Sequence, residues 1–510
     1  MPFENNQAEH LQRIRKAQAM GGPEKLDLLH REGRLNARER VTYLVDAETF
    51  HETGLFATSI RPEMRDKTPA DGKVAGFAQI NGRPIGLIAN DFTVLGASSS
   101  AVNSKKVHHV KEIATRKGMP LVFLGESTGA RMPDVMGAAG MGQSQNPTQY
   151  RRTRESPWAS AVLGFAFGSA AWYACMSDFT VMRKGSVMAV SSPRLVAMAT
   201  KERIDPEELG GWRLHSQVTG LVDMVVDTDE EALDAIKAFL SYLPSHQNEI
   251  PPKHPVPANA DQAVGGILDI LPENRQQVYD VRKIIQAVVD PGSVFELKSR
   301  YGRTIVTALA RIDGRVVGIV ANNPLVKGGA IDANGAAKAT EFLVLCDSFN
   351  MPIILFQDQP GFLVGLEAER QGMPGKVINW MNALSLCTVP KIAVILRKSY
   401  GQAFLNMGGG GNADELAAWW SAEISFMDPV AATVIVTGLI PAQDPQRFDQ
   451  AFQSVQKETS PYESAAVYGV QDVIDPRDTR DYLKTMLNVH DLRLTDGVGQ
   501  HYLSAWPTSF

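Results

Sequence analysis

The feature that most constrains the fold of this chain is an internal repeat. A shift of 232 positions aligns GFAQINGRPIGLIAND, which begins at Gly76, with ALARIDGRVVGIVANN, which begins at Ala308. The same shift, without a gap, aligns GMPLVFLGESTGARM with NMPIILFQDQPGFLV. Over residues 76–132 the two copies share 14 identities in 57 positions, and their apolar runs coincide. We therefore expect two domains of one fold, related by internal duplication.

Each copy repeats the same order of segments. An apolar run rich in β-branched residues leads into a Gly/Ser-rich loop and a helical segment, and then a second apolar run and another glycine loop follow. Short apolar strands that alternate with helices are typical of buried sheets in α/β proteins. The predicted strands cover 84–89, 121–124, 159–165, 316–321, 353–356 and 392–396, and the predicted helices include 102–116 and 336–346.

A proline-rich segment lies between the two copies. The chain has 510 residues, which is more than one hydrophobic core usually holds. Residues 251–262 carry four prolines, a composition that disfavours both helix and central strand. The sequence thus predicts an N-terminal domain over 1–250, a linker over 251–262 and a C-terminal domain over 263–510.

Composition excludes several classes of function. A net charge of −5 gives no general basis for nucleic-acid binding. The three cysteines lie far apart, so we expect neither a disulfide framework nor a Cys-x-x-Cys metal clip, and no metal. The N-terminal segment is polar and has no apolar stretch of a secretory signal. We expect a cytoplasmic protein.

One uncharged stretch, residues 156–177, approaches the length of a membrane span. It is rich in Ala, Gly and Ser rather than Leu and Ile, and it stands alone. We expect a buried strand, a tight turn at Gly168 and a buried helix, and no membrane association.

The segment Gly125–Gly129 matches G-x-S-x-G, the pattern that presents a nucleophilic serine in α/β-hydrolases. Ser127 would then need an acid and a histidine, such as His215 or His490. The second copy carries Gln359 in place of this serine, and a proline interrupts the helix that should follow. We predict that Ser127 is not a nucleophile.

Four glycines in matched pairs, Gly129 with Gly361 and Gly168 with Gly401, stand at junctions between strands, loops and helices. Unpaired backbone N–H groups at such junctions can bind a developing oxyanion, and a helix dipole strengthens that binding. The alternative is that these glycines only permit tight turns. That alternative explains one glycine more easily than four in pairs.

The loops PLVFLGESTGARM, DFTVLGASSSAVNSKKV, QDQPGFLVG and VPKIAVILRKSYGQAF resemble the carboxyltransferase (β) subunit of biotin-dependent acyl-CoA carboxylases, of the propionyl- and acetyl-CoA carboxylase type. The resemblance covers the chain from about Leu28 to Val473. It implies two tandem crotonase-like (ClpP/crotonase) domains in a homohexamer, a trimer of dimers, with each active site between domains of different protomers. It also implies transfer of the carboxyl group from carboxybiotin to the α-carbon of an acyl-CoA.

The resemblance assigns roles to particular loops. Amides of Gly129, Ala130, Gly168 and Ser169 would hold the thioester carbonyl. Amides of Gly361, Gln402 and Ala403 would hold the biotin ureido oxygen, and Gly96, Ala97 and Ser98 would lie beside the CoA.

The chain departs from the family pattern in several places. Thr128, Ser169 and Gln402 stand where the family has glycine. Such residues still supply an N–H, but their φ angles must stay negative. Leu405 replaces an acid of propionyl-type members, which suggests a different acyl pocket.

The chain has no Ala-Met-Lys-Met biotinylation site and no ATP-binding glycine-rich motif. The resemblance therefore implies that a separate subunit supplies the biotin carboxylase and biotin carboxyl carrier functions. It leaves open a carboxyltransferase subunit of a sodium-pumping acyl-CoA decarboxylase, which runs the half-reaction backwards. An inert scaffolding subunit also stays open, because three loop positions lack the family's glycine.

Overall fold

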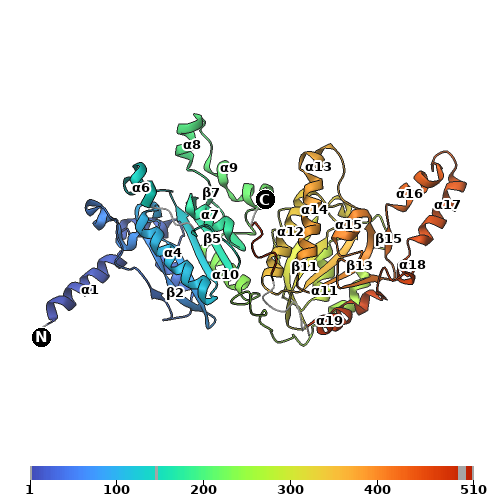
Figure 1. Cartoon of the computed structure of the whole chain (residues 1–510), viewed down its shortest axis with the longest axis horizontal. Helices are drawn as coiled ribbons and strands as arrows, with labels where there is room; N and C mark the ends of the chain where they lie inside the picture. The colour runs from blue at the N-terminus through green and yellow to red at the C-terminus, as the bar shows by residue number, and fades with distance from the viewer. Residues whose placement is uncertain (1–2, 144–147, 492–500, 508–510) are drawn as a thin grey trace. The chain divides into compact units, whose positions relative to one another are not determined.

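The computed structural model describes residues 3–143, 148–491 and 501–507. The chain forms two compact units, which divide between Gln247 and Asn248 (Figure 1). Residues 251–262 contain no helix or strand, and within them the His254 N–H donates to the carbonyl of Gly314 in the second unit.

The first unit is built on an eight-stranded sheet with the order β1-β2-β3-β4-β5-β6-β8, in which β7 also pairs with β5. Strands β3 to β6 run parallel, and β1 to β3 are antiparallel. The strands are β1 (His51–Glu52), β2 (Lys73–Ile80), β3 (Arg83–Asn90), β4 (Leu121–Ser127), β5 (Trp158–Phe167), β6 (Phe179–Arg183), β7 (Val187–Ala189) and β8 (Met224–Val226).

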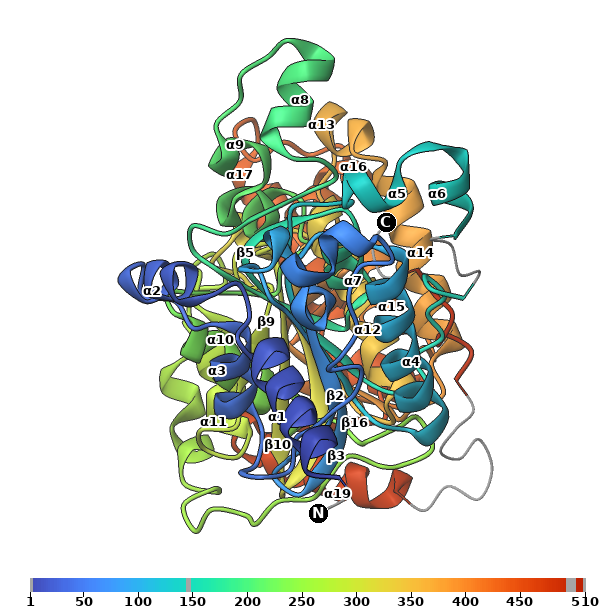
Figure 2. The ribbon, with the colours of Figure 1, turned by 90° about the vertical axis from the view of Figure 1, so that its left-hand side faces the viewer.

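Helices cover both faces of this sheet (Figure 2). On one face α3 packs on β2 and β3, and its neighbour α10 packs on β5 and β6; α4 packs on β2 and β3 from the other face. The helices of the unit are α1 (Glu4–Gln18), α2 (Pro23–Arg31), α3 (Ala37–Leu44), α4 (Ala101–Lys117), α5 (Met132–Val135), α6 (Gly137–Gln143), α7 (Ser169–Met176), α8 (Pro193–Thr200), α9 (Pro206–Gly210) and α10 (Asp229–Leu240).

The second unit repeats this topology with the order β16-β14-β13-β12-β11-β10-β9, and β15 also pairs with β13. Its strands are β9 (Phe295–Leu297), β10 (Ile305–Ile312), β11 (Arg315–Asn322), β12 (Ile353–Gln359), β13 (Lys391–Tyr400), β14 (Glu415–Trp419), β15 (Glu423–Ser425) and β16 (Asp472–Ile474). Its helices are α11 (Val281–Val288), α12 (Ala333–Ser348), α13 (Leu366–Arg370), α14 (Met373–Leu386), α15 (Gly401–Asn406), α16 (Pro429–Thr437), α17 (Pro445–Glu458), α18 (Pro461–Ala466) and α19 (Thr479–His490).

The shared topology confirms the predicted α/β duplication. Each predicted strand and helix lies within an observed one, and the uncharged stretch 156–177 forms β5, a turn at Gly168 and α7. Among the described residues, no helix is both long enough and apolar enough to cross a membrane.

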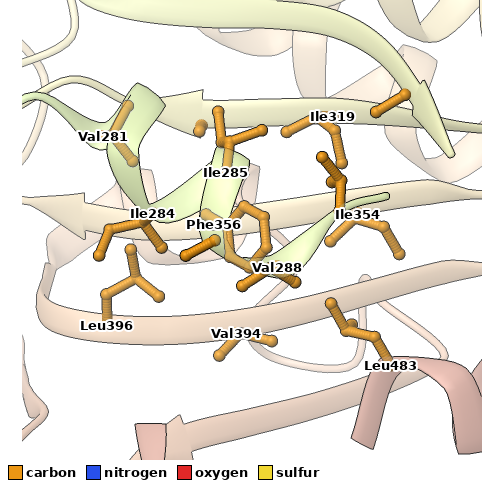
Figure 3. Packing of buried hydrophobic residues seen from close by; sticks show 14 of the residues in the cluster. Val281, Ile284, Ile285, Val288, Ile319, Ile354, Phe356, Val394, Leu396 and Leu483 are labelled. Atoms are coloured by element: carbon orange, nitrogen blue, oxygen red, sulfur yellow. The ribbon is translucent and has the colours of Figure 1, made fainter. Parts of the chain in front are cut away.

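The core of the second unit shows why its central strands are apolar throughout. Val281, Ile284, Ile285 and Val288 of α11 pack against alternate residues of β11, β12 and β13 (Figure 3). The intervening residues of β12 are fully buried as well, and α12 packs on the opposite face of the neighbouring strands β10 and β11. Strands buried on both faces read as continuous apolar runs, which is how the repeat became visible in the sequence.

Two matched glycines let a helix approach the sheet closely. A Cβ on Gly86 of β3 would lie 2.9 Å from the Cβ of Ala114 on α4. A Cβ on Gly318 of β11 would lie 2.3 Å from the Sγ of Cys346 on α12. Both distances are shorter than van der Waals contact, so these identities between the copies reflect packing.

We expect Gly318→Ala to lower the free energy of unfolding by about 1–3 kcal/mol, because the added methyl overpacks the contact with α12. Combining it with Cys346→Ala should recover part of the summed loss of the single variants in a double-mutant cycle. Gly375→Ala, in open space on α14, is the control and should cost nothing. Urea unfolding of the wild type and of the four variants measures these free energies. Unchanged stability of Gly318→Ala would contradict the packing argument.

Candidate functional site

A cavity of about 190 Å³ opens in the first unit where the parallel strands end. Gly129 and Ala130, after β4, form one part of its wall, and Gly168 and Ser169, after β5, form another. The four residues predicted to hold the thioester carbonyl thus lie around one cavity. Ligands bind at this edge of parallel sheets because the loops after the strands converge there.

The loop after β4 leaves one amide without a partner. Ser99 donates its N–H to the Gly129 carbonyl at 2.8 Å, and Arg131 donates its N–H to the Ser99 carbonyl at 2.8 Å. In this parallel bridge the amide of Ala130 faces away from Ser99, and no hydrogen bond among the described residues uses it. The Gly129 N–H instead donates to Ser127 Oγ at 3.0 Å. Of the predicted pair, Ala130 therefore supplies the available donor.

The loop after β5 supplies further donors. Gly168 has φ 63° and ψ −126°, the mirror image of the β region, which glycine alone populates readily. Helix α7 begins immediately afterwards without a side-chain cap, so the N–H of Ser169 has no intrahelical partner. The hydroxyls of Ser99 and Ser169 lie 2.9 Å apart and tie the two loops together. Two amides from different loops beside one cavity form the arrangement of an oxyanion hole.

The second unit repeats the bridge. Ile331 donates its N–H to the Gly361 carbonyl at 3.1 Å, and Leu363 donates to the Ile331 carbonyl at 2.7 Å. The amide of Phe362 points away from this bridge, as the amide of Ala130 does in the first unit. Sequence reasoning missed Phe362, although the 232-residue shift places it opposite Ala130.

The other predicted residues of the second loop are also placed by the structure. Helix α15 begins at Gly401 without a side-chain cap. On this helix, Gln402 is exposed and Ala403 is fully buried. Ala403 can therefore offer a ligand its backbone amide but not its side chain. Leu405 is half-buried on α15, within reach of Gly410.

The φ angles explain how the loops tolerate their departures from the family. Gly129, Gly168, Gly361 and Gly401 all have positive φ, between 62° and 122°. In contrast, none of the non-glycine residues that replace family glycines in these loops has a positive φ: Thr128, Ser169 and Gln402. In these loops, glycine thus remains at the four positions with positive φ, and the substituted positions avoid positive φ, as predicted.

The segment Gly96–Ser98 lies behind the cavity rather than in its wall. Ala97 and Ser98 are buried, and the Ala97 carbonyl accepts hydrogen bonds from Lys73 Nζ at 2.9 Å and Ser127 Oγ at 3.2 Å. Ser99 and Ser100 line the cavity in their place. Ala97 also has a positive φ, 48°, and so does its repeat counterpart Gly329, at 88° and without a Cβ. This segment therefore supports the Gly129 loop from behind.

Buried charges stand behind the same loops. Burial lowers the pKa of Lys73 to about 7, although the carboxylates of Asp71 and Asp91 oppose that shift. Asp71 also forms a buried ion pair with Arg131. Because these groups pair with one another and with backbone, they fix the loop and do not face a ligand.

A carboxylate in each copy anchors the strand end before the loop. Glu126 forms buried ion pairs with Arg34 and Arg40. Its counterpart Asp358 accepts from Arg397 Nε at 3.0 Å, and burial raises the pKa of Asp358 against the effect of that guanidinium. Removing one partner of such a pair leaves a buried charge uncompensated, so these pairs fix the strands that carry the glycines.

The structure leaves no catalytic triad at Ser127. This serine is fully buried, and its hydroxyl accepts from the Gly129 N–H and donates to the Ala97 carbonyl. The ring nitrogens of His215 lie 2.6 Å from the Met188 carbonyl and 3.1 Å from Thr219 Oγ1. His490 pairs with Glu415 in the second unit. In the described part of the chain, no group of three or more His, Cys, Asp or Glu side chains could hold a metal ion.

The fold and the paired loops define a two-domain carboxyltransferase of the crotonase fold. Two solved structures of transcarboxylase 12S match the chain with TM-scores of 0.88 and 0.89. They are 33% and 34% identical to it, and the matches cover 97% and 98% of this chain and the same shares of theirs.

Residues 29–494 match the carboxyl transferase domain, and the chain belongs to that family. The propionyl-CoA carboxylase carboxyltransferase subunit of Haloferax mediterranei is 34% identical over 508 residues, 97% of this chain and 96% of the relative. The methylmalonyl-CoA decarboxylase subunit alpha of Veillonella parvula is 32% identical over 479 residues, 92% of each chain. The chain is a carboxyltransferase of the acyl-CoA carboxylase type, which confirms the predicted family and excludes the hydrolase.

We expect Ser127→Ala to retain carboxyl transfer within about tenfold, a barrier change of about 1.4 kcal/mol or less. The variant should be less stable, because the part-buried Gly129 N–H loses its acceptor. Steady-state kinetics and treatment with a fluorophosphonate test this. Covalent labelling of Ser127 with loss of activity would overturn it.

Gly168→Ala should lower kcat by about 10²–10³, the usual cost of losing one preorganised donor. A Cβ at this position meets only Gly129 Cα, at 3.8 Å, so the effect should come from the backbone and not from a clash. Gly185→Ala is the matched control, since Gly185 also has a positive φ and open space but lies in the turn between β6 and β7. Equal loss of activity in both variants would contradict a role for the Gly168 loop.

Proposed function

We propose that the cavity of the first unit holds the thioester carbonyl of an acyl-CoA. The amides of Ala130 and Ser169 donate to the thioester oxygen, and Gly129 and Gly168 give the two loops the backbone conformation that aims these donors. A thioester α-carbon is a weak acid, so its enolate needs such stabilisation. The observation that carries this proposal is the pair of unpartnered amides beside one cavity.

We propose that the second unit receives biotin, carried by a separate biotin carboxyl carrier subunit or domain. Amides of Gly361, Phe362, Gln402 and Ala403 are the donors available for the ureido oxygen. The site fits a cyclic urea, since Gly361 is surrounded by open space and the buried Oε1 of Gln359 has no hydrogen-bond partner. When bound, biotin supplies the carboxyl group and, as the family resemblance implies, the base.

We propose that Gly96, Ala97 and Ser98 act by supporting the loop beside the CoA, and that Leu405 influences acyl selectivity from α15. Leu405→Asp should change the ratio of kcat/KM values among acyl-CoAs more than it changes biotin dependence. An unchanged profile in a folded, oligomeric variant would contradict this role.

We propose the partner and the direction of the reaction by analogy with the relatives. Transcarboxylase 12S is a hexamer that binds methylmalonyl-CoA, and we propose a homohexameric core, a trimer of dimers, for this chain. A biotin carboxylase partner makes the reaction a carboxylation. The similarity to methylmalonyl-CoA decarboxylase subunits keeps the reverse reaction as the second candidate. Cys175, Cys346 and Cys387 form no disulfide, which suits the proposed cytoplasmic location.

The assay that tests the function is carboxyl transfer to a panel of acyl-CoAs by the chain and its co-purified biotin-carrying partner. Decarboxylation of malonyl-CoA or methylmalonyl-CoA, dependent on free biotin, tests the chain without that partner. Activity in both supports the carboxyltransferase. Failure of both, with a folded hexamer, would favour an inert scaffold.

We expect two inactive variants to complement each other if the acyl-CoA unit of one protomer serves the biotin unit of another. Gly168→Val and Gly401→Val place a β-branched residue at matched positive-φ positions, which such residues hardly adopt. Mixing the two variants should restore part of the activity, because some sites then pair two intact units. No recovery after verified subunit exchange would contradict a site shared between protomers.

A further inference from the structure

The cavity of the first unit has an apolar side that the proposed chemistry does not use. Besides the amide-bearing loops, it is lined by Val135, Met141, Tyr150 and Trp172. Amides suffice to hold a thioester oxygen, so this apolar wall must contact another part of the ligand. Apolar walls with a few convergent polar groups are typical of small-molecule sites.

The aromatic pair is fixed in place. Trp172 lies three residues after Ser169 on α7, so both side chains lie on neighbouring positions of one helix face. Tyr150 meets Trp172 edge to face, with ring centroids 5.3 Å apart, and meets Tyr173 at 6.1 Å. Trp172 and Tyr150 nevertheless stay 45% and 44% exposed. A rigid aromatic pair that keeps nearly half of its surface open offers a contact area for an apolar ligand.

The internal repeat shows that the fold does not require this tryptophan. The pairing of Gly168 with Gly401 places Trp172 opposite Leu405, so the second unit forms the same helix with a smaller side chain. The tryptophan is specific to the unit that holds the acyl-CoA. Because the two units share this helix but differ at this position, we attribute Trp172 to ligand binding rather than to packing.

The size of the cavity limits the group it takes. A cavity of about 150 Å³ in an engineered protein holds one benzene molecule. The cavity here, at about 190 Å³, exceeds the needs of an acetyl or propionyl group. We propose, on the basis of the proposed function, that the acyl substrate carries an apolar group of about six carbons and that Trp172 and Tyr150 select it.

The test combines binding with turnover. Without the biotin partner the acyl-CoA is not turned over, so titration calorimetry of the full chain measures binding of propionyl-, hexanoyl- and phenylacetyl-CoA directly. The two larger ligands should bind at least tenfold more tightly than propionyl-CoA, since one methylene in an apolar pocket is worth about 10-fold or more. The preference between hexanoyl- and phenylacetyl-CoA then distinguishes an aliphatic from an aromatic acyl group.

The matched variant is Trp172→Leu, which installs the residue of the second unit. It should lower the ratio of kcat/KM for the preferred larger acyl-CoA, hexanoyl- or phenylacetyl-CoA, to that for propionyl-CoA at least tenfold. Trp420→Leu is the control, since Trp420 is 46% exposed but lies in the second unit. It should leave the ratio unchanged.

Two failures are distinguishable. Transfer to propionyl-CoA without a preference for larger acyl groups, or an unchanged ratio in Trp172→Leu, would overturn the acyl-size inference and leave the proposed function standing. Neither binding nor transfer with any acyl-CoA would overturn the proposed function itself.

Discussion

The structure depends on backbone conformations that only glycine adopts easily. At each of two loops in each unit, a glycine with positive φ turns the chain so that the next amide lacks an internal partner. An amide of this kind can donate to a ligand that comes to lie against it, without first breaking an internal hydrogen bond. In the proposed function, the amides of Ala130 and Ser169 beside the cavity of the first unit stabilise negative charge on a thioester oxygen without a catalytic side chain.

The rest of each unit holds these loops still. Both faces of the sheet are buried, Gly86 and Gly318 let helices approach it closely, and Glu126 and Asp358 anchor the strand ends through buried ion pairs. Interiors packed in this way transmit displacement, so the position of an amide depends on contacts far from the ligand. The two copies carry this support at matching positions, and they differ at residues of the proposed sites, such as Trp172 and Leu405.

Much of the fold could be predicted from the sequence, because strands buried on both faces are apolar and repeat without a gap. The strand β4 runs three residues past its predicted end, since Glu126 and Ser127 are polar but buried by an ion pair and a hydrogen bond. The glycines of the site were predictable from the repeat. The available amide was not, because only hydrogen-bond geometry shows that Gly129 is engaged and that Ala130 is available. Tyr150 and Trp172, distant in sequence, meet only in the folded chain.

The most direct test of this account is a crystal structure of the full chain with an acyl-CoA in the absence of the biotin partner. The account predicts that the thioester oxygen lies within about 3.1 Å of the amide nitrogens of Ala130 and Ser169, a normal hydrogen-bond distance. A thioester oxygen bound by a side chain, such as the hydroxyl of Ser99 or Tyr150, or a thioester outside this cavity, would contradict it.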